Sequence, residues 1–264
     1  MFHALYTAAT GMTAQELNLD NIANNLANSS TDGFQSRRMA FSDLLYQSEI
    51  MPGAAATQQT TVASGLQIGL GTIPGNTEIT QTQGDLTSTG NPLDLAIEGT
   101  GFFQVLLPTT NQIGYTRSGS FSTNEQGELV TANGDQLQPA ISIPANATNV
   151  TVGSDGTVSV TLPGQTQASQ VGQITLASFS DPGGLEAMGN NVYIPTTASG
   201  EPVVGPPGGS TGLGTIQQGY LEESNVNIVD EFVNMIVAQR TYESNSRVVK
   251  ASDEMLQQLN QLVQ

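Results

Sequence analysis

The residues that could support chemistry in this chain are few and scattered. His3 is the only histidine among 264 residues and there is no cysteine, which excludes multi-histidine and thiolate metal sites. No acidic residue lies near His3 in the sequence, so we interpret it as a surface residue of a helix rather than a catalyst. The spacings typical of zinc sites, EF-hands and P-loops are also missing.

The carboxylates offer the second possible chemistry. Glu125, Glu128 and Asp135 lie among turn residues, and a pair of carboxylates across a cleft could hydrolyse a glycosidic bond. Nothing in the sequence places two of them on opposite sides of a cleft, and solvated charges are common in turns. The segment GLGTIPG at 69–75 has the wrong spacing for a dinucleotide-binding loop and contains a proline. We therefore predict no catalytic residue, cofactor, metal ion or small-molecule substrate.

The charge distribution narrows the possible partners. Six basic and 23 acidic residues give a formal net charge of −17, which argues against binding to nucleic acid or to anionic lipid. Residues 46–217 hold twelve of the acidic residues and a single basic one, Arg117. We expect this acidic middle to stay solvated and the more balanced ends to pack together.

The start of the chain does not have the pattern of a secretory signal. Met1 to Ala4 lack a basic region followed by an apolar run, so we expect no cleavable signal peptide. No stretch is apolar and long enough to span a membrane. If the protein acts outside the cytoplasm, another export route has to carry it.

Both ends of the chain carry an apolar residue at every seventh position, a repeat that keeps one seam of a helix facing a partner helix. The spacing alone fits a seam inside one subunit and a seam between subunits equally well. The residues that we expect at a self-assembly interface are Leu5, Met12, Leu19, Ile22 and Leu26 near the start, and Ile228, Met235, Tyr242, Val249, Leu256 and Val263 near the end.

The seams require two helices. Residues 3–27 are predicted to form one, and the second is predicted to begin after Asn227, a good N-cap, and to run from Val229 to Gln264 without Gly or Pro. One apolar stripe offsets only part of the conformational entropy that so long a helix loses. We therefore expect both ends to be frayed in an isolated subunit and to become helical on assembly.

The middle of the chain is predicted to be β-structure. Asn133-Gly134 and Asp155-Gly156 are typical of tight hairpin turns. Strand-like triplets at 150–152 and 158–160 flank the second turn, and 171–179 is a further strand candidate. With a helix at each end, the expected fold class is α+β: paired terminal helices, an extended linking segment and a central β-rich domain.

Several motifs resemble those of the bacterial flagellar rod and hook proteins. They are ANNLANSSTDGF at 23–34, AIEGTGFFQV at 96–105, YTRSGSFSTNEQGELVTANG at 115–134 and QGYLEESNVNIVDEFVNMIVAQRTYESNSRVV at 218–249. The stretches LLYQSEIMPG at 44–53 and QTTVASGLQIGLG at 59–71 are most similar to the distal rod members. In the first motif, the residues that we expect to form a helix stop and turn are Asn24, Asn25, Asn28, Gly33 and Phe34.

The resemblance implies a structural protein rather than an enzyme. It implies a terminal helix at 1–30, a linking segment at 31–75 that contains the distal-rod-like stretch, a β-rich outer domain at 76–217 and a helix at 218–264 that completes a coiled coil with the first. Such a subunit would polymerise into a rigid tube that transmits torque from motor to hook across the periplasm.

The resemblance also implies the partners: further copies of the chain, the proximal rod, hook-side axial proteins, the P- and L-ring bushing and the flagellar type III export apparatus. Two alternatives remain open. One is a proximal rod or hook-type axial subunit, against which the stretch at 44–71 argues. The other is a secreted β-rich binding module with helical oligomerisation ends.

Overall fold

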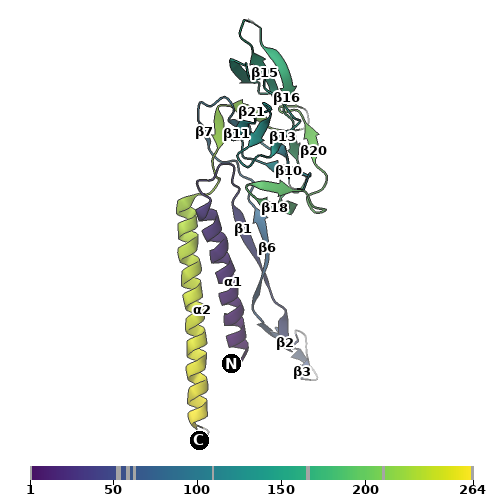
Figure 1. Ribbon diagram of the computed structural model, residues 1–264. Helices are drawn as coiled ribbons and strands as arrows, with labels where there is room; N and C mark the ends of the chain where they lie inside the picture. The colour runs from purple at the N-terminus through teal and green to yellow at the C-terminus, as the bar shows by residue number, and fades with distance from the viewer. Residues whose placement is uncertain are drawn as a thin grey trace. The chain divides into compact units, whose positions relative to one another are not determined.

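The computed structural model describes residues 2–51, 55–57, 60–61, 64–108, 110–164, 167–209 and 212–262. It has the expected α+β composition, with a helix at each end and β-strands between them (Figure 1). The chain divides into two compact units. Unit 1 holds Met1–Leu26, Arg37–Glu78 and Asn227–Gln264, and unit 2 holds Ala27–Ser36 and Ile79–Val226.

The boundaries of these units differ from the domain ranges expected from the sequence. The range 31–75 was expected to form one linking segment, but 31–36 group with the β-rich unit and 37–75 with the terminal helices. Residues 218–226, expected with the last helix, also belong to the β-rich unit. None of the helices in the described part of the chain is both long and apolar enough to cross a membrane.

Unit 1 contains the two long helices and a set of short strand pairs. Its elements are α1 (Phe2–Ala27), β1 (Arg37–Asp43), β2 (Tyr46–Ile50), β3 (Ala55–Thr57), β4 (Thr60–Thr61), β5 (Leu66–Gly69), β6 (Thr72–Ile79) and α2 (Ile228–Leu262). β1 pairs with β6, β2 with β5 and β3 with β4, each as a two-stranded ribbon. The sequence indicated only an extended linking segment over 31–75, so β1 and β2 were not predicted.

The N-terminal cap of α2 follows from its sequence. The Asn227 side-chain Oδ1 accepts hydrogen bonds from the backbone N–H groups of Val229 and Asp230, at 3.0 and 3.4 Å. Asp230 and Glu231 then place negative charge in the first turn, where the helix dipole favours it. The predicted N-cap is confirmed, and α2 has 35 residues.

Unit 2 is built from short strands. They are β7 (Leu86–Ser88), β8 (Leu95–Glu98), β9 (Phe102–Leu106), β10 (Ile113–Thr116), β11 (Phe121–Thr123), β12 (Leu129–Thr131), β13 (Gln136–Gln138), β14 (Asn149–Val152), β15 (Thr157–Thr161), β16 (Ser169–Gln173), β17 (Leu176–Ser178), β18 (Glu186–Gly189), β19 (Val192–Ile194), β20 (Val203–Gly205), β21 (Thr215–Gln218) and β22 (Tyr220–Glu222), with one 3-10 turn at Pro182–Gly184.

Nine of these strands form one sheet in the order β11-β12-β13-β9-β10-β19-β18, with β17 joining β9 to β20. Both predicted hairpins are present: β14 and β15 pair around Asp155-Gly156, and β12 and β13 pair around Asn133-Gly134. Gly134 and Gly156 have φ of 87° and 80°, which explains the preference for glycine there. The candidate strand at 171–179 is instead parts of two strands, β16 and β17.

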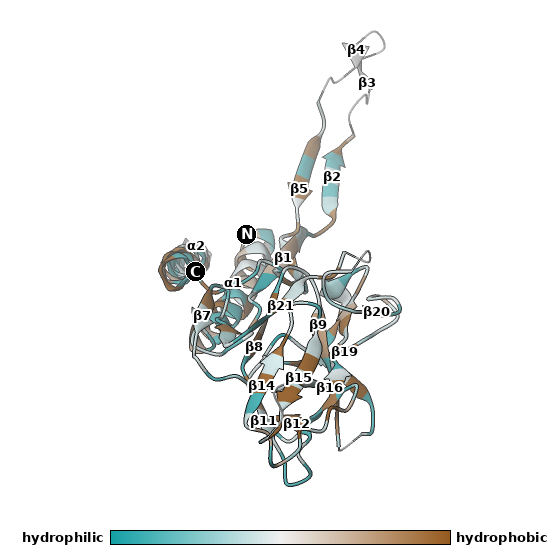
Figure 2. Cartoon of the chain, turned by 90° about the horizontal axis from the view of Figure 1, so that it is seen from above, coloured by the Kyte–Doolittle hydropathy of each residue, from teal (hydrophilic) through white to brown (hydrophobic). Residues whose placement is uncertain are grey.

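The core of unit 2 consists of two apolar clusters. The larger one contains Phe103, Leu137, Val158 and Leu176, all fully buried. β9 supplies Phe103 and β15 supplies Val158 and Val160, and both strands have hydrophobic stretches in Figure 2. The smaller cluster is aromatic, with Phe179 packed edge-to-face on Tyr115 at a centroid distance of 4.8 Å. Unit 2 therefore has its own hydrophobic core.

Candidate functional site

The two long helices of unit 1 contact each other along one side of each. Asn25 Nδ2 on α1 donates to Glu231 Oε1 on α2 at 3.0 Å. Fourteen residues earlier on α1, a Cβ on Gly11 would meet the Asn245 side chain on α2, fourteen residues later, at 2.7 Å. The equal spacing shows that the helices run antiparallel with little slip (Figure 1).

On α2, the residues facing α1 lie on two heptad lines rather than one. Met235, Val249 and Leu256 of the predicted line are half-buried, whereas Ile228 and Tyr242 are exposed and Val263 lies outside the described residues. The second line was not predicted because its residues are small or polar. It consists of Glu231, Ala238, Asn245 and Ser252.

On α1, the predicted seam residues all lose solvent contact to some extent. Ile22 is buried, and Leu5, Met12, Leu19 and Leu26 are half-buried. Ala8 and Ala14 are buried as well. Small side chains at these positions let backbones approach closely, as the Gly11–Asn245 contact illustrates.

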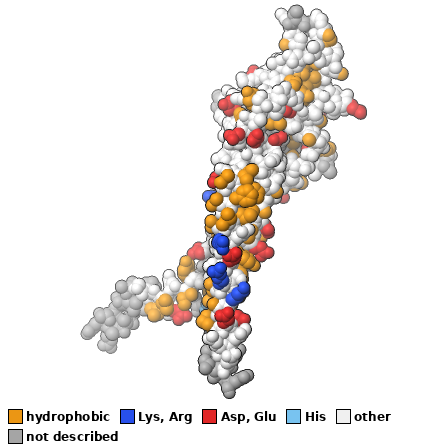
Figure 3. Space-filling view, turned by 90° about the vertical axis from the view of Figure 1, so that its left-hand side faces the viewer, with side chains coloured by type: hydrophobic (Ala, Val, Ile, Leu, Met, Phe, Trp, Pro, Cys, Tyr) orange, Lys and Arg blue, Asp and Glu red, His pale blue; other side chains and the backbone are white. Residues whose placement is uncertain are grey.

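The opposite side of α2 is an exposed apolar face. Val229, Phe232, Val233, Ile236 and Val237 are each about half exposed or more, and their spacing places them on one side of the helix, away from Ala238 and Asn245. Figure 3 shows these apolar side chains gathered together, with Lys and Arg side chains beyond them. Among the described residues nothing covers this face.

The asparagine motif near the end of α1 holds the following strand. Asn25 is buried; its Oδ1 accepts from the Arg37 N–H at 3.0 Å and its Nδ2 donates to the Arg37 carbonyl at 2.8 Å. Asn21 Nδ2 donates to the same carbonyl at 2.7 Å. Asn25 was predicted to be part of a helix stop and turn, and its side chain binds the first residue of β1. The Asn25 side chain makes two hydrogen bonds to the Arg37 backbone, as the backbone of a neighbouring strand would.

The turn that follows the motif belongs to unit 2. Asn28 accepts from the Thr31 hydroxyl at 3.3 Å, and Asn24 lies one position before Asn25 on an exposed side of α1. Gly33 has φ of 69°, the left-handed region anticipated for it, and a Cβ there would meet the Ser118 backbone at 2.6 Å. Phe34 is buried. Both residues therefore pack tightly into the β-rich unit.

An ion pair buried in unit 2 was not anticipated from the sequence. Arg117 contacts Glu222 through Nη2 at 2.8 Å and Nε at 2.9 Å, and the two side chains are 8% and 0% exposed. Arg117 Nη1 also donates to the carbonyls of Gly99 and Gly101. Burial raises the pKa of the Glu222 carboxyl, while the Arg117 guanidinium acts in the opposite direction. The charge is thus held in an almost water-free site by hydrogen bonds.

Glu222 and Asn225 join segments that are distant in the sequence. Glu222 Oε1 accepts from Gln35 Nε2 and the Gly84 N–H, at 3.3 and 3.2 Å. Asn225 accepts from the Ser36 N–H at 2.7 Å and donates to the Thr80 carbonyl at 2.8 Å. These contacts hold together three segments of unit 2 that are distant in the sequence, at 35–36, 80–84 and 222–225.

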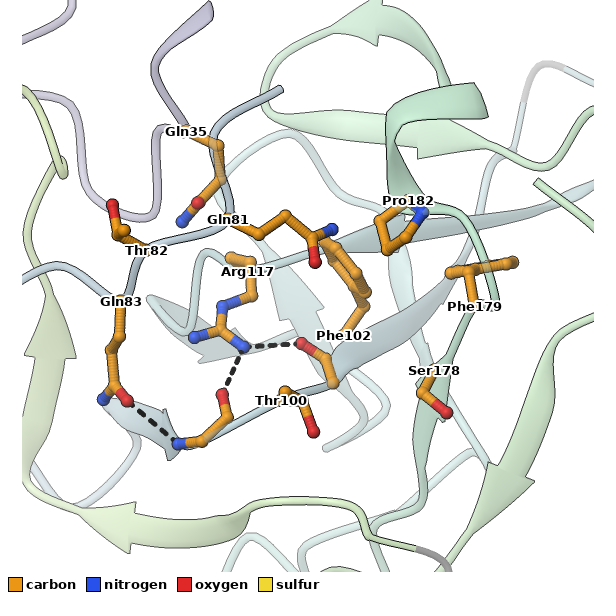
Figure 4. A pocket seen from close by; sticks show the side chains of 12 residues that line it. Gln35, Gln81, Thr82, Gln83, Thr100, Phe102, Arg117, Ser178, Phe179 and Pro182 are labelled. Carbon is orange, nitrogen blue, oxygen red and sulfur yellow. Dashed lines mark hydrogen bonds between the residues drawn. The ribbon is translucent and has the colours of Figure 1, made fainter. Parts of the chain in front are cut away.

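One pocket in unit 2 has a volume of about 410 Å³ (Figure 4). Its lining includes Phe102, Phe179, Gln83 and the Arg117 guanidinium, which points at the backbone carbonyls beside it. Gln83 is engaged with the Gly99 N–H and the Ile97 carbonyl. The Arg117 and Gln83 side chains of this pocket therefore hold the protein's own loops.

The candidate catalytic carboxylates are likewise engaged locally. Glu128 accepts from Asn124 Nδ2 at 2.9 Å, and Asp135 accepts from the Thr131 hydroxyl at 3.1 Å, each within its own turn. Glu125 and His3 are exposed. The searched part of the chain contains no group of three or more potential metal ligands. These residues are not brought together into a site.

Comparisons with known proteins decide the family. Three family models match: "Flagella basal body rod protein" at residues 5–35, "Flagellar hook protein FlgE/F/G D1 domain" at 96–160 and "Flagellar basal body rod FlgEFG protein C-terminal" at 217–262. The flagellar basal-body rod protein FlgG of Buchnera aphidicola (Acyrthosiphon pisum strain) is 48% identical over 99% of this chain and 100% of its own length. The chain belongs to the FlgG family.

Further FlgG proteins match over nearly the whole chain. The one from Caulobacter vibrioides is 47% identical over 98% of both chains, and the one from Bacillus subtilis is 39% identical over 98% of both. These names are those of rod proteins and not of enzymes. As a FlgG-family member, the chain is a structural subunit of the flagellar basal-body rod, and its helices and asparagine motif coincide with two of the three matched regions.

Proposed function

We propose that this chain polymerises into the distal rod, a rigid tubular shaft that transmits torque from the flagellar motor to the hook. The observation that carries the proposal is the exposed apolar face of α2, formed by Val229, Phe232, Val233, Ile236 and Val237. A contiguous apolar surface of this kind is typical of a protein interface. The similarity to FlgG proteins along the whole chain supports the same conclusion.

The terminal helices are proposed to form an antiparallel coiled coil within each copy. Their two contacts, Asn25–Glu231 and Gly11–Asn245, and the half-buried heptad residues support this pairing. The polar members of the seam would fix its register, since a misplaced Asn or Glu loses its partner. The opposite face of α2 then remains for contacts with neighbouring copies, which would complete the interface.

The remaining partners follow from a place in the distal rod. They are the proximal rod proteins, the hook-side axial proteins, the P- and L-ring bushing and the type III export apparatus. No catalytic role, cofactor or small-molecule substrate belongs to this proposal. Support for a mechanical rather than chemical role comes from the carboxylates of unit 2, which are engaged in their own turns.

The ribbon of β2 and β5 is proposed to stiffen the assembled rod. Its side chains are almost all exposed, including Tyr46, Ile50, Leu66 and Ile68. An isolated two-stranded ribbon has little stability in water, so packing against a neighbour would explain its apolar residues. Deleting 52–66, much of which lies outside the described residues, should leave polymerisation intact and produce bent tubes in electron micrographs. Straight tubes would contradict this role.

The test of the proposed function is electron microscopy of the concentrated, purified protein. The full chain should form tubes, and deletion of residues 1–27 or 228–264 should abolish them. Circular dichroism of subunit and polymer should show more helix in the polymer if the ends fold on assembly. A protein that stays a soluble small oligomer at high concentration, with or without its ends, would overturn the proposal.

A further inference from the structure

The outward face of α2 changes character along the helix. After the apolar residues that end at Val237 it becomes basic, with Arg240, Arg247 and Lys250 on the same side of the helix. Arg240 pairs with Glu243 on its own helix at 3.2 Å. Among the described residues, Arg247 and Lys250 have no ion pair. Together with Arg37, they are the basic residues that form no ion pair in the described part of this strongly acidic protein.

The outward face of α1 is complementary to this surface. One row of its exposed residues is small or acidic, and Tyr6 and Leu17 are exposed beside it. In that row Ala9, Thr13, Glu16, Asp20 and Ala23 follow one another at intervals of three and four. α1 contains neither Lys nor Arg. The described residues include no ion pair of Glu16 or Asp20. Small neighbours allow another helix to approach the two carboxylates closely.

The two charged sets cannot meet within one copy. The Gly11–Asn245 and Asn25–Glu231 contacts place Glu16 level with Arg240, and Asp20 level with Ile236. Lys250 and Arg247 therefore lie ten to eleven residues further along α2 than the carboxylates, or roughly 16 Å. In addition, each charged set faces away from the seam between the helices.

We propose that Arg247 and Lys250 on α2 of one copy bind Asp20 and Glu16 on α1 of a second copy. This inference rests on the proposed self-assembly and identifies the chemistry that sets its register. In a polar assembly every copy points the same way, so α1 of the second copy runs antiparallel to α2 of the first. In that orientation Glu16 meets Lys250 while Asp20 meets Arg247. The spacings of four residues on α1 and three on α2 fit both pairs at once.

The proposed contact predicts an axial shift between neighbouring copies. A displacement of roughly 16 Å brings both carboxylates level with both cations. A smaller shift that pairs Glu16 with Arg247 would bring Asp20 opposite Glu243, and like charges disfavour that register. The ion pairs would thus select among the ways in which two copies can slide along each other, while apolar contacts supply most of the affinity.

Charge reversal and charge exchange test the pairing. Sedimentation of the purified full chain at low salt should show that Glu16→Lys with Asp20→Lys raises the critical concentration for polymerisation by about tenfold. Arg247→Glu with Lys250→Glu should do the same. The four substitutions together restore opposite charges and should bring the value back to within about twofold of wild type. The matched control, Glu186→Lys with Glu201→Lys in unit 2, changes the net charge equally and should have little effect.

Cysteine pairing tests the register directly, since the chain has no cysteine of its own. Two proteins, one with Ala23→Cys and one with Ser244→Cys, should form mixed disulfide dimers when they are polymerised together under oxidising conditions. Ala9→Cys lies on the same face but about 21 Å away, too far for a disulfide in the proposed register. It should not cross-link to Ser244→Cys.

The outcomes separate this inference from the proposed function. If wild-type protein does not polymerise, the proposed function fails. If it polymerises but the double reversals leave the critical concentration unchanged, or the exchange does not restore it, the ion pairs are wrong. Cross-linking of Ala9→Cys in place of Ala23→Cys would overturn the register alone.

Discussion

In unit 2 fifteen apolar side chains form one buried cluster, whereas nine large apolar side chains of α2 in unit 1 remain exposed. The β-rich unit buries most of its large hydrophobic residues and pairs the buried Arg117 with Glu222 within a single copy. The terminal helices bury one side of each and leave the other side open. The difference indicates which part of the chain is available for assembly: unit 2 has a buried core of its own, whereas the exposed face of α2 in unit 1 is the surface proposed to contact neighbouring copies.

The largest effect should come from breaking the buried ion pair of unit 2. Arg117→Ala leaves the Glu222 carboxylate buried without its partner, and we expect the free energy of unfolding to fall by about 3–5 kcal/mol. Urea unfolding followed by circular dichroism measures this loss. Arg38→Ala removes an exposed ion pair and serves as the control, with an expected loss below about 1 kcal/mol. Equal losses in the two variants would contradict the distinction.

The loss of stability in Arg117→Ala should depend on pH. Burial already raises the pKa of Glu222 in the folded protein, and removing Arg117 raises it further. For a carboxyl whose pKa is higher folded than unfolded, stability is retained below the unfolded pKa and is lost as the pH rises through the folded pKa. Arg117→Ala should therefore lie closest to wild type in acid and furthest from it at neutral pH. A deficit that grows on acidification would show that Glu222 is not its source.

The second-largest effect should appear in the critical concentration for polymerisation and not in the stability of the subunit. Ile236 is 57% exposed on the outward face of α2, so Ile236→Glu should leave the stability of the subunit nearly unchanged. In the polymer it replaces an apolar contact worth about 2 kcal/mol with a buried carboxylate, and the critical concentration should rise roughly a hundredfold or more. Met188→Glu, at an equally exposed position of unit 2, is the control. Sedimentation measures the critical concentration of both variants, and only the substitution on the outward face of α2 should raise it.

Local features of this fold could be predicted from the sequence, because adjacent residues determine them. The Asn227 cap and the turns at Asp155-Gly156 and Asn133-Gly134 each depend on a few neighbouring positions. The Arg117–Glu222 pair could not be predicted, since its members are 105 residues apart and nothing near either one indicates the other. The only signal was that Arg117 is the single basic residue of the acidic middle.

The seam between the helices could be predicted only in part. An apolar repeat reveals Met235, Val249 and Leu256, but it cannot reveal Ala238 and Ser252 on the second heptad line. Small and polar residues are buried there because α1 approaches closely, and this closeness is a property of the pair of helices. For the same reason Asn25 was interpreted as part of a helix stop, although it also contacts β1 and α2.

A smaller effect should follow from changing Asn25. Asn25→Asp retains the acceptor for the Arg37 N–H but loses the donor to the Arg37 carbonyl, and it places a carboxylate against Glu231. We expect a loss of about 2 kcal/mol in unit 1 at neutral pH, measured by thermal unfolding at a helix-sensitive wavelength. The companion variant Asn25→Asp with Glu231→Gln removes the repulsion and should recover part of the loss. No recovery would mean that Glu231 does not contribute to the site.

The smallest effect concerns Gly11, which lies on α1 close to the Asn245 side chain of α2. Gly11→Ala gains helix propensity of about 1 kcal/mol, but its Cβ would meet Asn245 Nδ2 at 2.7 Å, so the side chain has to move. We expect the two effects nearly to cancel in the wild-type protein. With Asn245→Ala the obstacle disappears, and the same substitution should stabilise unit 1 by about 0.5–1 kcal/mol. A gain of the same size in both backgrounds would show that the helices do not depend on this close approach, and that the seam of unit 1 is looser than the core of unit 2.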